Sequence, residues 1–416
     1  VELYRKLQLP DPENIGFRYP HQVSGGQLQR AMTAMAMSCR PDLIIFDEPT
    51  TALDVTTQIE VLAAIKDIVK QYNTAAIYIT HDLAVVAQMA DRIMVLRYGH
   101  MIEEGHAGEL IANPKEEYTA RLVAVRSFQK QAVVEINKEV PLLKVDNITA
   151  SYGGSGGVLV LKDVGMEIHR AQTVAVVGES GSGKSTLARV ITGLLPPLEG
   201  RIAYNGEIMS QALAGRSRDQ LRRMQMIYQM PDTALNPRQR VREIIGRPLE
   251  FYLGLTGDKK AERLDELMTM IELEPKEFID RYPGELSGGQ KQRVCIARAL
   301  AAEPELIICD EVTSALDQLV AEEILKLLQR LQDDLKVSYM FITHDLATVK
   351  AIADEVVVML RGEVVEQGAK DDIFTPPHHE YTDLLLSSVP EMDPDWLENL
   401  LRDRARTGKV SSFVDN

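Results

Sequence analysis

The stretch "GESGSGKST", from Gly178 to Thr186, decides the fold of this chain. It fits the pattern GxxxxGK[ST] and directly follows "TVAVVG" (Thr173 to Gly178), an apolar run that is typical of a buried strand. Glycines let backbone N–H groups close around phosphate oxygens, and the helix that follows presents its positive N-terminus to them. The stretch therefore predicts a strand, a phosphate-binding loop and a helix, with Lys184 reaching the outer phosphates and Ser185 coordinating Mg²⁺.

Further apolar runs alternate with longer amphipathic stretches downstream of this loop. They are "LIICDE" (Leu306 to Glu311), "YMFITHD" (Tyr339 to Asp345) and "VVVML" (Val356 to Leu360). Buried strands that alternate with helices favour an α/β core with a parallel sheet.

The pair Asp310 and Glu311 ends one of these strands. A carboxylate there can hold the water shell of Mg²⁺, and its neighbour can accept a proton from an attacking water. An Asp-Glu pair is more often a solvated turn. The preceding apolar run, and its recurrence in "LIIFDEPT" (Leu43 to Thr50), favour the catalytic interpretation.

A long internal repeat organises the chain. "RYPHQVSGGQLQR" begins at Arg18 and "RYPGELSGGQKQR" begins at Arg281, 263 positions later. The same offset pairs Asp47 with Asp310 and His81 with His344, and it holds without a gap from Arg18 to Tyr118. Such a register indicates a duplicated domain.

Each copy contains SGGQ before a helix-forming stretch, which in the first copy runs from Leu28 to Met37. A helix N-terminus with exposed N–H groups is a natural anion site, although a plain turn with an N-cap remains an alternative.

His344, in "ITHD", is a candidate contact for the γ-phosphate, whereas a lone histidine is more often structural. Met32, Met35 and Met37 are expected to pack in the core.

The second copy has an upstream half, Leu142 to Asp280, that the first copy lacks apart from a helical remnant over Val1 to Phe17. We therefore expect a fragment with four parts: the C-terminal part of a first domain (1–125), a linker (126–141), a complete second domain (142–390) and a charged tail (391–416). One short helix is predicted around Trp396 to Arg404, with Trp396 packing that helix.

Composition narrows the function. The 416 residues are 45% hydrophobic and 26% charged, enough for two or three domain cores. A net charge of −15 argues against a nucleic-acid-binding surface. The best apolar run, "VITGLLPPL" (Val190 to Leu198), is too short to cross a bilayer, so any membrane role needs a partner. The three cysteines are expected to be small buried hydrophobes.

These motifs resemble the ATP-binding subunits of ABC transporters. "TALD" (Thr51 to Asp54) and "SALD" (Ser314 to Asp317) resemble that family's D-loop, and "YQMPDTALNPR" (Tyr228 to Arg238) resembles its Q-loop in peptide importers. "HHEYTDLLLSSVP" (His378 to Pro390) resembles the C-terminal extension of the oligopeptide, dipeptide and nickel import ATPases. The resemblance implies P-loop NTPase cores with a parallel sheet and a helical subdomain each, plus an antiparallel β subdomain in the second copy.

The resemblance also completes the set of expected site residues. It implies that the catalytic residues are Glu311, His344 and Gln229. It also implies that Ser185, Gln229 and Asp310 contact the metal ion. The nucleotide-binding set is Tyr152, which would stack on adenine, then Gly178, Ser180, Gly181, Ser182, Gly183, Lys184, Ser185 and Thr186, with Ser24, Gly25, Gly26, Gln27 and Asp54 of the first copy. The implied cofactors are ATP and Mg²⁺.

Domains of this family pair head to tail, so the resemblance implies that Lys184 and Ser185 face Ser24 to Gly26, with Asp54 at the border. This pairing would be intramolecular or intermolecular, and it leaves at most one hydrolytic site in the sequence as given. The implied partners are membrane permease subunits and, through them, an extracytoplasmic solute-binding protein. The implied location is the cytoplasmic face of the plasma membrane, as a peripheral subunit without nucleic acid.

Two alternatives stay open at this point. One is a soluble two-domain ATPase that acts on ribosomes, although such relatives usually carry "NHLD" where this chain has TALD and SALD. The other is a truncated chain that binds ATP as a sensor or is inert. The leading hypothesis is an ATPase that energises the import of peptides or similar small solutes.

Overall fold

The computed structural model describes residues 1–51, 53–124 and 140–407, so residues 126–139 of the predicted linker and Ala52 of the TALD motif lie outside the described residues. The described residues fall into two compact units. Unit 1 holds the chain up to residue 124, the short stretch Asp317–Leu319 and residues 383–407, and unit 2 holds residues 140–316 and 320–382.

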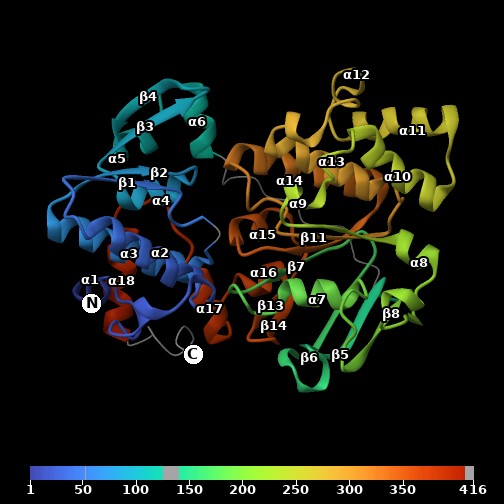
Figure 1. Cartoon of the computed structure of the whole chain (residues 1–416), viewed down its shortest axis with the longest axis horizontal. Coiled ribbons are helices and arrows are strands. Elements are labelled where there is room, and N and C mark those ends of the chain that lie inside the picture. The colour runs from blue at the N-terminus through green and yellow to red at the C-terminus, as the bar shows by residue number, and fades with distance from the viewer. Residues whose placement is uncertain (52, 125–139, 408–416) are drawn as a thin grey trace. The chain divides into compact units, whose positions relative to one another are not determined.

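Unit 2 is built on a six-stranded sheet whose strand order is β10-β11-β12-β7-β13-β14. Figure 1 labels β7, β11, β13 and β14 of this sheet. The strands are β7 (Thr173–Val177), β10 (Met224–Ile227), β11 (Leu306–Asp310), β12 (Ser338–Ile342), β13 (Glu355–Leu360) and β14 (Glu363–Ala369). Neighbours are parallel except for the β13–β14 hairpin. The predicted α/β fold with a parallel sheet is confirmed, and β7 lies inside the sheet between β12 and β13.

Two layers cover the faces of this sheet. A four-stranded antiparallel sheet, β6 (Val158–Ile168), β5 (Leu143–Tyr152), β8 (Glu199–Tyr204) and β9 (Glu207–Ile208), forms one hydrophobic core together with α7 (Lys184–Ile191). The other core contains the helices α10 (Val241–Leu253), α11 (Gly257–Met270), α13 (Gly288–Leu300) and α14 (Gln318–Leu335). The antiparallel β subdomain expected for the second copy is thus present.

The remaining helices of the second copy are short. They are α8 (Arg218–Arg223), α9 (Pro231–Ala234), α12 (Pro275–Phe278), α15 (Leu346–Ile352), α16 (Lys370–Ile373) and α17 (Glu380–Ser387).

Unit 1 contains two separate pairs of strands. The parallel pair is β1 (Leu43–Asp47) with β2 (Ala75–Ile79), and the antiparallel pair is β3 (Arg92–Arg97) with β4 (His100–His106). By the 263-residue offset these are the counterparts of β11, β12, β13 and β14. In unit 2, β7 joins the two pairs, whereas no strand lies between them in the described part of unit 1.

The helices of unit 1 are α1 (Glu2–Lys6), α2 (Gly25–Met37), α3 (Val55–Tyr72), α4 (Leu83–Met89), α5 (Ala107–Ala112), α6 (Glu117–Ala124) and α18 (Trp396–Thr407). Of the helical remnant expected over Val1 to Phe17, only α1 and a short 3₁₀ turn at Ile15–Phe17 are helical.

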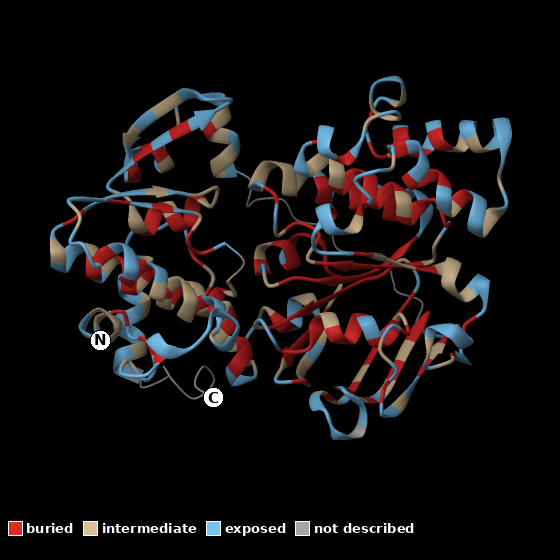
Figure 2. Cartoon of the chain, viewed as in Figure 1, coloured by how far each residue is buried: buried red, intermediate tan, exposed pale blue. Residues whose placement is uncertain are grey.

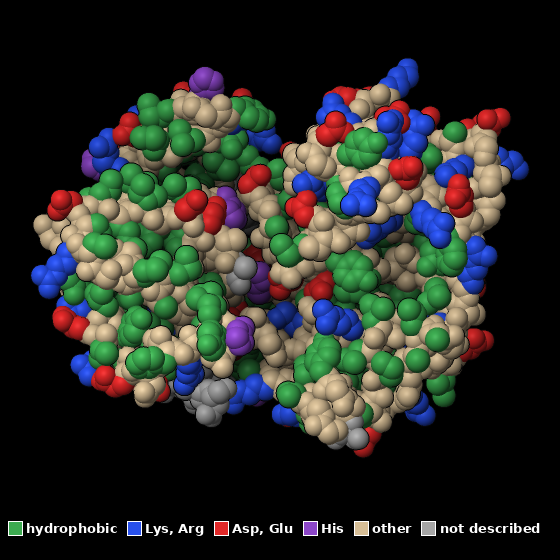
Figure 3. Space-filling view, viewed as in Figure 1, with side chains coloured by type: hydrophobic (Ala, Val, Ile, Leu, Met, Phe, Trp, Pro, Cys, Tyr) green, Lys and Arg blue, Asp and Glu red, His purple; other side chains and the backbone are tan. Residues whose placement is uncertain are grey.

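One face of the β1–β2 pair is exposed. Leu43 and Ile45 are 50% and 59% exposed, whereas their counterparts Leu306 and Ile308 are fully buried against the core that contains α7. Figure 2 shows the same contrast between β1 and β2 and the sheet of unit 2, and Figure 3 shows hydrophobic side chains on the surface over the strands of unit 1. The opposite face of β1 is buried, because Ile44 and Phe46 pack with α2 and α3.

The C-terminal helix α18 packs in unit 1. Leu397 is fully buried with Ile59 and Leu62 of α3 and Val85 of α4, and Trp396 packs against this cluster. The predicted helix and the packing role of Trp396 are therefore confirmed.

Two expectations about burial are wrong. Met37 is buried, but Met32 and Met35 are exposed because they lie on the face of α2 that points away from the core of unit 1.

Cys295 and Cys309 are buried as expected, and burial raises the pKa of the Cys295 thiol to about 11. Cys39 is exposed, since it follows the end of α2.

Candidate nucleotide site

The loop from Gly178 to Gly183 connects β7 to α7 at the carboxyl end of the parallel strands. Gly178 has a φ of 149°, and a Cβ atom there would lie 2.2 Å from the carbonyl oxygen of Met359. Any other residue would force β13 away from the loop. Gly183 is the N-cap of α7, so the helix begins at Lys184, at the end of the loop.

The Lys184 ammonium lies over the loop and is buried. Its Nζ donates hydrogen bonds of 2.7 Å to the carbonyl oxygens of both Gly178 and Glu179, and it lies 3.5 Å from Ser182 Oγ. A cation held above a ring of backbone groups at a helix N-terminus is suited to a phosphate chain.

Ser185 and Asp310 form a pair of oxygen donors beside Lys184. Ser185 Oγ donates a 2.9 Å hydrogen bond to Asp310 Oδ1. Burial raises the pKa of Asp310, and the nearby negative charge of Glu311 raises it further. The hydrogen bond from Ser185 acts in the opposite direction. A hydroxyl and a carboxylate at this spacing fit the oxygen coordination that Mg²⁺ prefers.

Glu311 follows β11 with a φ of 50°, a left-handed conformation that is uncommon for glutamate. Gln229 Nε2 donates a 2.6 Å hydrogen bond to Glu311 Oε2, and His344 Nδ1 lies 3.5 Å from Glu311 Oε1. Burial raises the pKa of Glu311, but the hydrogen bond and charge of His344, together with the charge of Lys184 and a hydrogen bond from Ser314, outweigh it, and the pKa ends below its ordinary value. Glu311 is therefore an ionised carboxylate at neutral pH.

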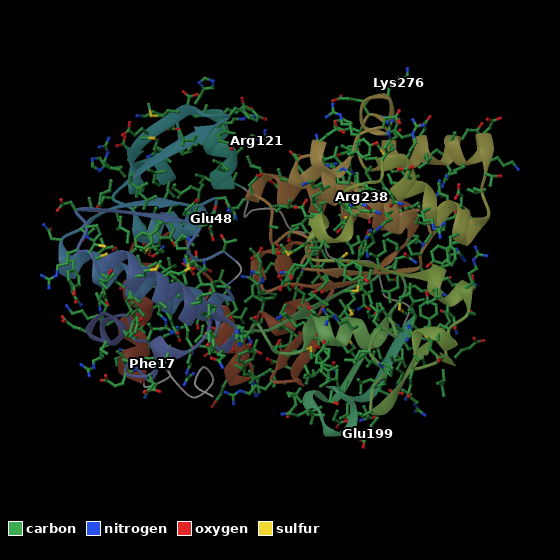
Figure 4. All side chains as sticks on the ribbon, viewed as in Figure 1. Phe17, Glu48, Arg121, Glu199, Arg238 and Lys276 are labelled. Carbon is green, nitrogen blue, oxygen red and sulfur yellow. The ribbon has the colours of Figure 1, made fainter. Side chains whose placement is uncertain are left out.

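The first copy reproduces the carboxylate and histidine. Glu48, labelled in Figure 4, follows β1 with a φ of 47°. Its Oε1 lies 2.8 Å from His81 Nδ1, and Thr51 Oγ1 donates a 2.6 Å hydrogen bond to its Oε2. Glu48 therefore shares with Glu311 the left-handed backbone and the histidine partner, but its Oε2 accepts from Thr51 where that of Glu311 accepts from Gln229. The described part of unit 1 has no phosphate-binding loop.

The two SGGQ stretches have the same geometry. Ser24 and Ser287 are N-caps, and each serine Oγ accepts the N–H of the glutamine three residues later at 3.3 Å. In turn, the side-chain Oε1 atoms of Gln27 and Gln290 accept a hydrogen bond from the backbone N–H of Ser24 and Ser287. The sequence reasoning missed this capping box, although the S-x-x-Q spacing signals it.

The second glycine of each SGGQ has a packing role. A Cβ atom at Gly26 would lie 2.2 Å from Thr57 Cγ2 of α3, and one at Gly289 would lie 2.5 Å from Val320 Cγ1 of α14. Ser24 and Gly25 are exposed, as are Ser287 and Gly288, so the accessible part of each signature is its first two residues.

The remaining predicted residues lie as follows. Tyr152 ends β5 and is 42% exposed, with its hydroxyl 3.3 Å from Thr186 Oγ1. Arg189 Nη1 donates a 2.9 Å hydrogen bond to the same hydroxyl, a contact that the sequence did not indicate. Asp54 is the N-cap of α3 and accepts the Thr57 N–H at 2.9 Å.

Unit 2 therefore brings together Tyr152, the glycine-rich loop, Lys184, Ser185, Gln229, Asp310, Glu311 and His344. Ser24, Gly25, Gly26, Gln27 and Asp54 belong to unit 1. No helix in the described residues is long and apolar enough to cross a membrane.

Comparisons with known proteins agree with this geometry. The family model described as ABC transporter matches residues 2–51 and 161–314, and the model described as oligopeptide/dipeptide transporter, C-terminal region, matches residues 365–413. The glutathione import ATP-binding protein GsiA of Escherichia coli K12 is 39% identical over 422 residues, which cover 94% of this chain and 68% of that protein. GsiA of Salmonella paratyphi A is 38% identical over the same extent.

Among solved structures, cbiO1 from Clostridium perfringens, part of the ABC transporter complex cbiONQ, superimposes with a TM-score of 0.51 at 32% identity. The alignment covers 57% of this chain and 91% of cbiO1. Taken with the loop, the carboxylate pair and the two signatures, these matches show that the chain belongs to the ABC transporter family, as one of its ATP-hydrolysing subunits.

Proposed function

We propose that this chain hydrolyses ATP to drive the import of an oligopeptide, a dipeptide or a similar small solute. The observation that carries the proposal is Glu311, an ionised carboxylate held by Gln229 and His344 beside the loop of Lys184. The match of residues 365–413 to an oligopeptide/dipeptide transporter region supports the solute class. The GsiA relatives import glutathione, itself a small peptide.

In this proposal the backbone N–H groups of the loop from Ser180 to Thr186 and the N-terminus of α7 bind the phosphates, whereas the Glu179 N–H already donates to Tyr381. Lys184 exchanges the carbonyl oxygens of Gly178 and Glu179 for the outer phosphate oxygens. Ser185, Asp310 and Gln229 would hold Mg²⁺, which supplies charge neutralisation on the β- and γ-phosphates when bound. Tyr152 offers an exposed ring for the adenine.

Glu311 then acts as the general base. Its carboxylate accepts a proton from the attacking water, and Gln229 and His344 orient the carboxylate and its surroundings. Ionisation at neutral pH is required for this role, and the lowered pKa of Glu311 provides it.

Exchanging Glu311 for glutamine tests this role, with Glu48→Gln as the matched control. Glu311→Gln should slow ATP hydrolysis by about 10² to 10⁴, the range of a lost general base, while ATP still binds. Glu48→Gln should stay within about twofold of the parent, because Glu48 has the matching backbone conformation and histidine partner but, in the described part of unit 1, adjoins no phosphate loop. Steady-state phosphate release and ATP binding by calorimetry measure both. Normal turnover in Glu311→Gln would remove Glu311 from this role.

The wider assembly is also proposed. Membrane permease subunits are the partners of an ABC importer ATPase, and we propose an extracytoplasmic solute-binding protein that acts through them. The chain would then lie on the cytoplasmic face of the plasma membrane.

We further propose that residues 1–125 are the C-terminal part of a first ABC domain, that residues 142–390 are a complete second one, and that the two pair head to tail. In that pairing Ser24, Gly25, Gly26 and Gln27 cover the nucleotide bound at Lys184, and Asp54 borders it. Support comes from the matching helix N-termini of α2 and α13, each with its serine and first glycine exposed.

A further inference from the structure

Tyr381, a residue of the C-terminal extension, contacts the phosphate-binding loop. This tyrosine is the second residue of α17 and is fully buried. Its hydroxyl oxygen accepts a 2.8 Å hydrogen bond from the backbone N–H of Glu179, the second residue of the loop. Both residues belong to unit 2.

The hydrogen bond matters because of which peptide group it holds. The carbonyl of the Gly178–Glu179 peptide accepts the Lys184 ammonium at 2.7 Å, and the N–H of the same peptide donates to Tyr381. This peptide plane is therefore held at both ends by side chains. Rotation of the plane would turn the Gly178 carbonyl away from Lys184 and change which backbone groups face the phosphates.

Tyr381 is itself held in place by the segment before α17. His379 Nδ1 accepts the Tyr381 N–H at 3.2 Å, and the His379 N–H donates to Glu366 Oε2 of β14 at 3.1 Å. A series of hydrogen bonds thus connects β14, through the start of α17, with the loop.

The first copy contains the same segment without the loop. Glu103, the counterpart of Glu366, accepts the Glu116 N–H at 3.1 Å, just as Glu366 accepts the His379 N–H. Tyr118, the counterpart of Tyr381, is half-buried beneath the Arg97 guanidinium, which lies 4.7 Å from its ring centre. The duplicated tyrosines therefore differ in what they contact.

We infer that Tyr381 is a positioning residue for the nucleotide site: its hydroxyl fixes the Gly178–Glu179 peptide in the orientation that binds phosphate. The extension matched as an oligopeptide/dipeptide transporter C-terminal region is then a structural component of ATP binding. This inference rests on phosphate binding by the loop of Lys184, as proposed above.

Tyr381→Phe tests the inference, because it removes the acceptor and keeps the ring that fills the core. Loss of one net hydrogen bond should lower the fraction of loops in the binding-competent state and weaken ATP binding by about two- to tenfold. KM for ATP should rise by the same factor, and kcat at saturating ATP should stay within about twofold. A loss of packing alone would lower the thermal midpoint without this split between KM and kcat.

Tyr118→Phe is the matched control and should leave both KM and kcat unchanged. Lys184→Ala, in the same binding assay, reports on the loop itself. Strong binding in Lys184→Ala would show that the phosphate site is elsewhere and would overturn the proposed site together with the inference. Weak binding in Lys184→Ala with parental binding in Tyr381→Phe would overturn the inference alone, as would equal effects of the two tyrosine variants.

Discussion

Burial and charge have opposite effects on the pKa of the His344 imidazole, which lies beside Glu311. Burial lowers the pKa of His344, but the hydrogen bond and charge of Glu311, with a smaller contribution from the charge of Asp345, outweigh it, so the pKa lies above its ordinary value of 6.5. The contribution of the His344 charge to stability is fully present below pH 6.5 and is lost as the pH rises through the raised pKa. The contribution of the Glu311 charge to stability is present above pH 4.5 and is lost as the pH falls through the lowered pKa of Glu311.

Removing the charge of Glu311 should therefore reverse the shift of His344. In Glu311→Gln the lowering by burial remains, so the pKa of His344 should fall to 6.5 or below. An NMR titration of the imidazole measures it directly. Glu48→Gln should leave the pKa of His344 unchanged, and a raised pKa in Glu311→Gln would contradict the pairing.

At the scale of elements, α18 shows how the last helix becomes part of the first unit. The Gln88 amide of α4 is buried, and its Nε2 donates to the carbonyl oxygens of Glu391 and Asp393 at 2.7 and 2.6 Å. Its Oε1 accepts the Leu397 N–H at 3.0 Å. The counterpart of Gln88 in the second copy is Ala351, which cannot make these bonds.

Leu397→Ala should destabilise unit 1 by about 2 to 5 kcal/mol, the cost of a cavity left by a buried leucine. Leu401→Ala, on the same helix but 37% exposed, should cost about 1 kcal/mol or less. Trp396 is the single tryptophan of the chain, so its fluorescence during urea unfolding reports on this helix. Equal midpoints for the two variants would show that α18 does not depend on Leu397 for docking.

The strands illustrate what could be predicted at this scale. The runs around β7, β11 and β13 agree with the strands within one residue, and the run around β12 extends three residues beyond its end, because fully buried strands consist of continuous apolar residues. The exposure of Met32 and Met35 could not be predicted, because helical spacing alone does not say which face of α2 meets α3. Likewise, the packing of α18 depends on contacts more than 300 residues apart in sequence, such as Gln88 with Asp393.

For the whole molecule, the duplicated signatures allow the head-to-tail pairing to be tested with matched variants. Ser24 Oγ accepts the Gln27 N–H, and this bond does not use the hydroxyl hydrogen, which can donate to a phosphate oxygen. Ser24→Ala should therefore lower kcat/KM for ATP about ten- to a hundredfold, as for a lost hydrogen bond to a charged group. Ser287→Ala should cost the same stability as a lost N-cap, about 1 kcal/mol, without that loss of activity.

The opposite pattern, with Ser287→Ala impaired and Ser24→Ala normal, would indicate pairing between two copies of the chain through the second signature. Normal activity in both variants would contradict any composite site.

The sequence alone determined the α/β class, the phosphate loop, the carboxylate pair and the duplication, because these depend on local patterns and on a constant offset. Only the tertiary structure decided which groups meet. It places Gln229 and His344 on Glu311, Arg189 on Tyr152, and Tyr381 on the loop. It also shows that the described strands of unit 1 form two separate pairs, whereas in unit 2 β7 lies between the corresponding pairs and joins them into one sheet. The physical reason is that hydrogen bonds and packing join residues that are distant in sequence, and no local pattern encodes such partners.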